Sequence, residues 1–165
     1  KLLRITLENS RNKTVLLSQE IEGVEHYLAL QNLENTAYQY KVLVDDGIDA
    51  SLFKIPPMLI QPFVENAIEH AFINQQEQRY IEVLVKQESQ KLICTIIDNG
   101  VGIDTRNLDK QKNKNSLATT ITSERLKMLS KDFNMEGSLA IEDRQKYDEQ
   151  GTIVTLVIPH KTSAS

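Results

Sequence analysis

The sequence predicts an α+β fold, a two-layer α/β sandwich in which helices pack on one face of a mixed, mainly antiparallel sheet. Apolar residues recur at helical spacing in three segments and alternate with polar residues in five others. Two alternating segments follow one another across the polar turn ESQK, which is typical of an antiparallel hairpin. The order helix, strand, helix, two strands, loop, helix, two strands favours the α+β class.

Helices are expected in three places. The first covers residues 18–34, with Ser18 as its cap and Leu30 among the apolar residues at helical spacing. The second has Pro56 and Pro57 in its first turn, where proline is tolerated. The third covers residues 119–131, where helical spacing returns after a long polar stretch.

Strands are expected where the alternation has a period of two, because successive side chains of a strand point to opposite faces. The five segments are 38–44, 80–86, 92–98, 138–143 and 151–159. Residues 104–116 are polar and lysine-rich with almost nothing to bury, which indicates a mobile loop.

The composition predicts one soluble globular domain. A length of 165 residues allows one full hydrophobic core, and 40% apolar with 25% charged residues is ordinary for a folded domain. Basic residues number 19 against 23 acidic ones, for a net charge of −4. No positive field is therefore present to hold nucleic acid, and we expect no nucleic-acid partner.

The single cysteine and the lack of a long apolar run indicate a cytoplasmic domain. Cys94 lies within the apolar stretch LICTII and has no intrachain partner, which favours a buried thiol in a reducing compartment. No run approaches the ~18 apolar residues of a membrane span, so no membrane insertion by this segment is expected. Since the chain begins with Lys1, we expect a piece of a longer protein.

We predict three parts in this chain. Residues 1–17 are expected to be the remnant of a preceding helical region, residues 18–160 to form the domain, and residues 161–165 to be a tail that frays.

The stretch QPFVENAIEHAF, residues 61–72, places polar chemistry on a helix that buries one face. At 100° per residue its apolar residues cluster on one side, while Asn66 and His70, four apart, share a neighbouring stripe with Glu69 beside them. One interpretation is an ordinary solvated face. The other is a metal site, because an amide oxygen can bind Mg²⁺ together with phosphates and waters.

The stretch IIDNGVGID, residues 96–104, places an acid at the end of a strand. Asp98 is in phase with apolar neighbours, so its carboxylate points toward their layer and needs a hydrogen-bond partner there. A ligand amine can be that partner, and Gly100 and Gly102 let the backbone approach a flat ring. The alternative is a simple turn, since D-N-G is also a hairpin signal.

A third stretch, Gly151-Thr152 before the last strand, carries little information alone. In this order, however, VENAIEH, DNGVGI and GT resemble the ATP-binding fold shared by gyrase, Hsp90, histidine kinases and MutL, often called the Bergerat fold. The resemblance spans about residues 18–159. Within that superfamily IPPMLIQPFVENAIEHAF, EIEGVEHYLALQNLE and SERLKML resemble segments of the LytS and YehU type of sensor histidine kinases.

The resemblance implies that ATP and Mg²⁺ are the cofactors. Asp98 would accept the adenine amino group, with Gly100 and Gly102 close to the base. Thr152, after Gly151, would support the adenine through Asp98 or a water.

The phosphate side is implied in the same way. Asn66 would bind Mg²⁺ between phosphate oxygens, and Glu65 and His70 would lie near the phosphates or the metal. The polar loop of residues 104–120 would be the lid over the triphosphate, with Ser116 and Thr119 at its end among the nucleotide-binding residues.

The chain departs from the family pattern in two places. The lid of the family ends in G-x-G-L, whereas SLAT stands here, and a lysine usual three residues after the motif Asn is replaced by Glu69. Phosphate cradling by backbone amides is therefore altered. Cations that would compensate are Lys112, Lys114 or Arg125.

The resemblance implies a protein histidine kinase that donates the γ-phosphoryl group to a histidine on an upstream segment absent from this chain. His26 and His160 are read as ordinary side chains. Hydrolysing relatives have a glutamate where Pro62 stands, which disfavours a stand-alone ATPase. A degenerate nucleotide-binding or docking module is the alternative.

The implied partners follow from the same resemblance. They are the upstream dimerisation and phosphoacceptor segment, a second copy of the parent protein, and a response regulator, commonly of the LytTR type. The parent is expected to be a bacterial protein anchored in the inner membrane.

Overall fold

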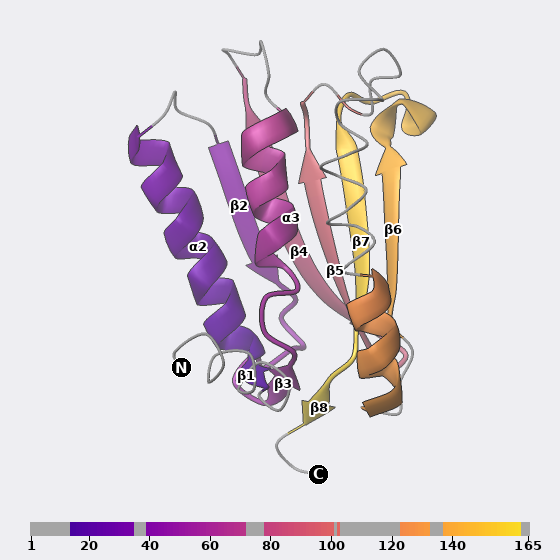
Figure 1. The fold of residues 1–165 in the computed structure, drawn as a ribbon. Helices are drawn as coiled ribbons and strands as arrows, with labels where there is room; N and C mark the ends of the chain where they lie inside the picture. Colours follow the sequence, from indigo (N-terminus) through magenta and orange to yellow (C-terminus); the bar gives the residue numbers. More distant parts are fainter. Residues whose placement is uncertain are drawn as a thin grey trace, which may run out of the picture.

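The computed structural model describes residues 14–34, 39–71, 78–100, 102, 123–132 and 137–162. Within these residues, helices lie on one face of a five-stranded sheet, so the predicted two-layer α+β architecture is confirmed (Figure 1). The strands of this sheet are β2 (Gln39–Val44), β4 (Tyr80–Glu88), β5 (Lys91–Asp98), β6 (Ser138–Asp143) and β7 (Thr152–Ile158).

The sheet is mixed, as the sequence predicts. Its order is β2-β4-β5-β7-β6, with β2 parallel to β4 and every other neighbouring pair antiparallel. The turn between β4 and β5 holds Ser89 and Gln90 at φ values of 48° and 68°. Two consecutive positive φ values match the twist of the flanking strands, so this turn closes a tight hairpin.

The core lies between the sheet and the helices. Ile81, Val83 and Val85 of β4 are buried, while Glu82 and Lys86, which are out of phase with them, face the other side of the sheet. This alternation leaves one face of the sheet to solvent. Each fully buried Val, Leu or Ile side chain of such a core contributes about 1.5–3 kcal/mol.

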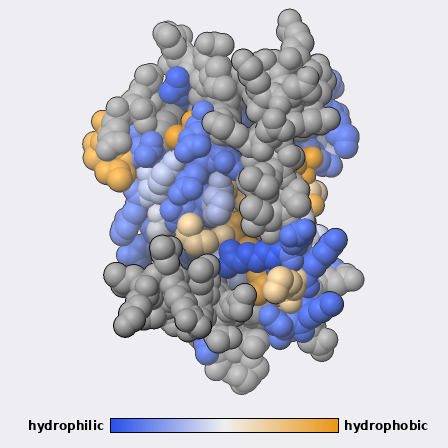
Figure 2. All heavy atoms as spheres, in the orientation of Figure 1, coloured by the Kyte–Doolittle hydropathy of each residue, from blue (hydrophilic) through white to orange (hydrophobic). Residues whose placement is uncertain are grey.

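Besides the short 3-10 turn of residues 144–147, the described residues contain four helical segments. They are α2 (Leu17–Glu34), α3 (Gln61–Asn66), the π-helical turn η1 (Ala67–Ala71) and the helix of residues 123–132. Figure 2 shows a mainly hydrophilic surface on the helix-bearing side, with a hydrophobic patch at one end of α2. Leu30 and Leu33 of α2 are 54% and 85% exposed, so Leu30 lies in the predicted helix but outside its buried face.

Helix starts differ from the prediction. The first helix begins at Leu17, and the backbone N–H of Leu16 donates to Oε1 of Gln19, so Ser18 is not its cap. The next helix begins at Gln61, with Pro62 in its first turn, and Pro56 and Pro57 lie before it. Proline suits either position, and only the tertiary contacts of this segment decide between them.

A second, small sheet was not predicted. It has the order β1-β3-β8, with β1 (Val15–Leu16), β3 (Phe53–Ile55) and β8 (Lys161–Thr162), all antiparallel. Val15 and Leu16 are therefore strand rather than helix, and Lys161 and Thr162 pair with β3 rather than fray. Strands of two or three residues carry too little alternation to be recognised in a sequence.

Candidate functional site

Asp98 is the last residue of β5 and lies on the helix-covered face of the sheet. It is opposite Ile81 on one side and Thr152 on the other. Its side chain is only 5% exposed, and Ile81 beside it is fully buried. The phase argument from the sequence thus places this carboxylate correctly, among apolar side chains at the end of a strand.

The carboxylate of Asp98 is partly satisfied by backbone. Its Oδ1 accepts hydrogen bonds from the backbone N–H groups of Gly100 at 2.9 Å and Thr152 at 3.3 Å. Burial raises the pKa of Asp98, while these amides and the Arg144 guanidinium act in the opposite direction. Among the described residues Oδ2 has no hydrogen-bond partner, so one oxygen remains to accept a hydrogen bond from a ligand.

Asn99 rules out the simple hairpin turn as an explanation of D-N-G. Its Oδ1 accepts from the backbone N–H of Tyr80 at 2.8 Å, and its Nδ2 donates to the carbonyl of Gln78 at 2.6 Å. The strands next to β5 are β4, which precedes it, and β7, which begins only at Thr152, so D-N-G closes no tight hairpin with either. Asn99 instead ties the end of β5 to the start of β4.

Two glycines allow backbone segments to meet around Asp98. Gly151 has φ of +117°, and a Cβ there would lie 1.9 Å from the carbonyl oxygen of Asp98. Gly102 has φ of +76°, and a Cβ there would lie 3.0 Å from Oδ2 of Asp143. The backbone conformation favours glycine at both positions, and at Gly151 the space also excludes any side chain.

Arg144 joins the turn before β7 to the end of β5. It opens the 3-10 turn η3 (Arg144–Tyr147), and its Nη1 donates to the carbonyl of Asp98 at 2.9 Å. Its backbone N–H donates to the carbonyl of Gly151 at 2.9 Å, and its Nη2 bonds to Glu149. No signal in the sequence singled out this arginine, because its partner is 46 residues away.

Asn66 ends α3 where the helix widens into the π-helical turn η1. Such turns are frequent at functional sites. The side chain is half-buried and has no hydrogen-bond partner among the described residues. Because the turn is π-helical, the expectation of uniform α-helical spacing between Asn66 and His70 is wrong; the side chain of His70 lies outside the described residues.

Of the remaining predicted residues, the structure describes Glu65 but not those of the predicted lid. Glu65 is half-buried, accepts from Nε2 of Gln61 at 3.1 Å and contributes to raising the pKa of Tyr27 on α2, after burial. Ser116 and Thr119 lie outside the described residues, as do Lys112 and Lys114.

Arg125 is not a free cation for phosphate. Its Nη1 donates to the carbonyl of Met58 at 3.0 Å, and its Nη2 donates to the carbonyl of Pro57. The expectation that Arg125 compensates for a missing phosphate-facing lysine is therefore wrong, since both terminal nitrogens bind backbone.

The helix formed by α3 and η1 runs toward the end of the sheet where β5 ends and β7 begins, at the top of Figure 1. Two of the three sequence motifs, at the end of β5 and the start of β7, are in direct contact through Asp98 and Thr152.

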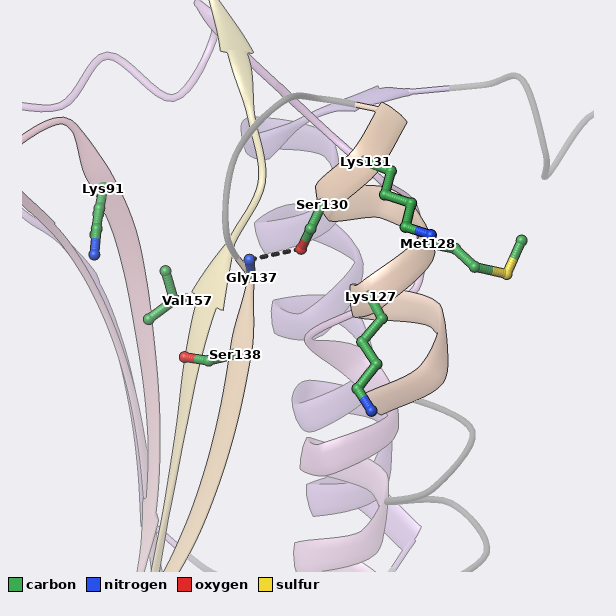
Figure 3. A pocket seen from close by; sticks show the side chains of 8 residues that line it. All are labelled: Lys91, Lys127, Met128, Ser130, Lys131, Gly137, Ser138 and Val157. Atoms are coloured by element: carbon green, nitrogen blue, oxygen red, sulfur yellow. Dashed lines mark hydrogen bonds between the residues drawn. The ribbon is translucent and has the colours of Figure 1, made fainter.

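A hollow at the opposite end of the sheet has different chemistry. Its volume is about 670 Å³, and it lies between the helix of residues 123–132 and the strand ends that carry Lys91 and Val157. In Figure 3 the ammonium groups of Lys91, Lys127 and Lys131 do not converge on one point. This hollow lacks the geometry of a phosphate site.

The fold and the site define the class of protein. Residues 57–162 match the family described as histidine kinase-, DNA gyrase B- and HSP90-like ATPases. The chain belongs to this family, and the predicted ATP-binding fold is confirmed.

Its relatives narrow the class further. The chain is 33% identical over 168 residues to the sensor protein LytS of Staphylococcus epidermidis, covering 99% of this chain and 27% of that protein. It is 34% identical to LytS of Enterococcus faecalis, covering 96% of this chain and 27% of that protein. The resemblance to LytS-type sensor kinases is confirmed, and the chain spans about a quarter of the length of these relatives.

Solved structures support the fold. The catalytic domain of the histidine kinase ThkA superposes with a TM-score of 0.58 at 17% identity, covering 89% of this chain and 95% of that one. Full-length ShkA in complex with AMPPNP gives a TM-score of 0.65 at 11% identity, covering 92% and 32%. Within the described residues, no helix is long and apolar enough to cross a membrane.

Proposed function

We propose that this chain is the ATP-binding catalytic domain of a sensor histidine kinase. The observation that carries the proposal is the buried carboxylate of Asp98, whose Oδ1 is held by two backbone amides while Oδ2 has no partner among the described residues. A carboxylate acceptor at a glycine-lined strand end suits the amino group of adenine. The family match over residues 57–162 supports this assignment.

Mg²⁺ fits the residues at the other side of the site. The amide oxygen of Asn66 has no hydrogen-bond partner among the described residues, and Mg²⁺ in nucleotide sites takes few protein oxygens. The described residues contain no group of three or more His, Cys, Asp or Glu side chains that could hold a metal ion. Bound Mg²⁺ would neutralise charge on the transferred phosphoryl group. The side chain of Asn66 would hold the Mg²⁺ ion, with Glu65 and His70 near the metal or the phosphates.

The acceptor of the phosphoryl group would be a histidine on an upstream segment of the same protein. The further partners would be a second copy of that protein and a response regulator, of the LytTR type, and the parent would be anchored in the bacterial inner membrane. In this chain Pro62 stands where hydrolysing relatives carry a glutamate, which favours transfer over hydrolysis.

The proposal is tested with a longer form of the protein that includes the upstream histidine. Incubation with labelled ATP and Mg²⁺ is expected to yield an acid-labile phosphoprotein. A protein that binds ATP yet never becomes labelled would support a docking module instead.

Replacing Asn66 by Ala is expected to remove the effect of Mg²⁺ on ATP binding. In Mg²⁺ the affinity for ATP should fall by ~10-fold, the equivalent of about 1.4 kcal/mol, because one oxygen ligand is lost. In excess EDTA the affinities of the variant and the unmodified chain should agree. Calorimetric titration under both conditions measures this, and an equal loss in EDTA would contradict the metal assignment.

Replacing Arg144 by Met should weaken ATP binding by ~3- to 10-fold. The guanidinium holds the Asp98 carbonyl and lowers the pKa of Asp98 against the effect of burial. Lys146→Met in the same 3-10 turn is the matched control, since Lys146 is 66% exposed and its ion pair, at 3.5 Å, is with the side chain of Glu142. Equal affinities for the two variants would argue against a role for Arg144.

The buried state of Asp98 predicts opposite pH dependences of stability and binding. Burial raises the pKa of Asp98 in the folded chain above its ordinary value of 3.8. At pH values between 3.8 and this raised pKa, the folded chain therefore binds more protons than the unfolded chain. The free energy of unfolding should therefore decrease as the pH rises through this window. ATP affinity should increase over the same window, because the amino group needs the ionised carboxylate. Titrations on the unmodified chain and Asp98→Asn check this, and identical profiles would contradict it.

A further inference from the structure

Two charged side chains from distant parts of the chain converge on the turn before α3. Glu20 of α2 is only 7% exposed. Its Oε2 accepts from the backbone N–H of Met58 and its Oε1 from that of Ile60, both at 3.3 Å. Buried carboxylates are costly unless they are hydrogen-bonded, so these contacts explain how Glu20 is tolerated in the core.

The carbonyl groups of the same turn bind the opposite charge. Arg125, on the helix of residues 123–132, donates to the carbonyls of Pro57 and Met58. Burial lowers the pKa of Arg125, while the carboxylate of Glu20 acts in the opposite direction. The two side chains thus bind the donors and the acceptors of one short backbone segment, 38 to 68 residues away along the chain.

The turn that they hold has a conformation that the local sequence disfavours. Met58 has φ of +59°, in the left-handed region that a side chain such as methionine rarely adopts. Ile60 is the N-cap of α3 and provides no side-chain cap, so the carboxylate of Glu20 binds the N–H at this helix start. Pro62 suits the first turn of α3, but the carboxylate that binds the N–H groups of Met58 and Ile60 comes from a distant part of the chain.

The position of the turn determines the position of Asn66. The N–H groups of Phe63 and Val64 donate to the carbonyl of Ile60 at 3.1 and 3.4 Å, and α3 runs without a loop to Asn66. A displacement at Ile60 therefore moves Asn66, and small displacements of a ligating group weaken metal and phosphate contacts.

We infer that Glu20 and Arg125 are positioning residues that hold the turn of residues 57–60 and thereby aim Asn66 at the Mg²⁺–phosphate part of the bound nucleotide. This inference rests on the proposed function. It assigns a shared role to the two segments EIEGVEHYLALQNLE and SERLKML, which no sequence spacing connects.

The expected result separates the phosphate end of the site from the adenine end. In Glu20→Gln and in Arg125→Lys, the gain in ATP affinity on adding Mg²⁺ should shrink by ~10-fold, whereas the affinity for adenosine should stay within ~2-fold. Lysine keeps the charge of Arg125 but cannot donate to two carbonyls in a fork. Glu22→Gln, on the exposed face of α2, and Lys127→Gln, on the exposed face of the helix of residues 123–132, are the matched controls.

A second measurement needs no nucleotide. Hydrogen exchange of the backbone amides of Met58 and Ile60 should be ~10-fold faster in Glu20→Gln than in Glu22→Gln, because their acceptor is weakened. Unchanged exchange and an unchanged Mg²⁺ effect would overturn the inference, as would equal losses for ATP and adenosine. If Glu20→Gln does not fold, Arg125→Lys decides by the same comparison.

Different results would refute the proposed function itself. If the unmodified chain bound no ATP, or if Asp98→Asn left its affinity unchanged, the nucleotide site itself would be refuted. The exchange measurement would still decide whether Glu20 holds the turn.

Discussion

Replacing Asp98 by Asn is expected to lower the affinity for ATP by ~100-fold or more while the protein stays folded. The Oδ1 of asparagine can still accept from the amides of Gly100 and Thr152, which bond to Oδ1 of Asp98. The new NH₂ group, however, meets the adenine amino group as donor against donor. The binding free energy loses a charge-assisted hydrogen bond of about 1.5–3 kcal/mol. The two donors left facing each other without an acceptor cost about 1–3 kcal/mol more. Since about 1.4 kcal/mol changes the affinity tenfold, the sum corresponds to ~100-fold or more.

Stability distinguishes this effect from unfolding. The carboxylate of Asp98 is buried at a cost that raises its pKa, and asparagine has no charge to desolvate. The free energy of unfolding of Asp98→Asn at neutral pH should therefore equal or exceed that of the unmodified chain. Chemical denaturation and calorimetric titration with ATP measure the two quantities. A stable variant with unchanged ATP affinity would remove the basis of the proposed function.

Replacing Gly151 by Ala is expected to destabilise the whole domain by several kcal/mol. The added Cβ would lie 1.9 Å from the carbonyl oxygen of Asp98 and 2.8 Å from Cα of Asn99, which is backbone and cannot rotate away. The φ of +117° adds about 1–3 kcal/mol of strain for any residue with a side chain. Relief requires β5 and β7 to separate where Asp98 and Thr152 pair.

The chain offers a matched control for this substitution. Gly47 has no atom within 4 Å of the position of an added Cβ. Gly47→Ala should change the free energy of unfolding by less than about 1 kcal/mol. Denaturant titrations of both variants check the difference, and similar midpoints would show that the close approach at Gly151 is not needed for the fold.

The strand pattern around Asp98 was predictable because it depends on local periodicity. Alternation with a period of two placed Asp98 in phase with Cys94 and Ile96, and the structure buries all three. The hairpin of β4 and β5 followed from the short polar turn between them. Family membership followed from three motifs in order, although none of them was specific alone.

The sequence did not reveal the contacts that support these motifs. Arg125 was expected to face phosphate, but the fold brings the turn of residues 57–60 to it, 67 to 68 residues away along the chain. No sequence pattern marked Arg144 as a residue that supports the site. Ser18 was expected to cap the first helix, but this helix begins at Leu17. A charged residue in a sequence shows its charge but not the backbone groups that surround it after folding.

The sequence by itself determined the layers of this protein, its strand order along the chain, and the acid and amide that we propose bind nucleotide and metal. Periodic burial and turn chemistry are properties of a few neighbouring residues, so a short window contains them. Only the tertiary structure decided where α3 begins, why Gly151 must be glycine and which charges hold the site. Those features depend on contacts between groups that are far apart in the chain and meet only when the sheet and the helices pack. No pattern within a short stretch of sequence specifies such contacts.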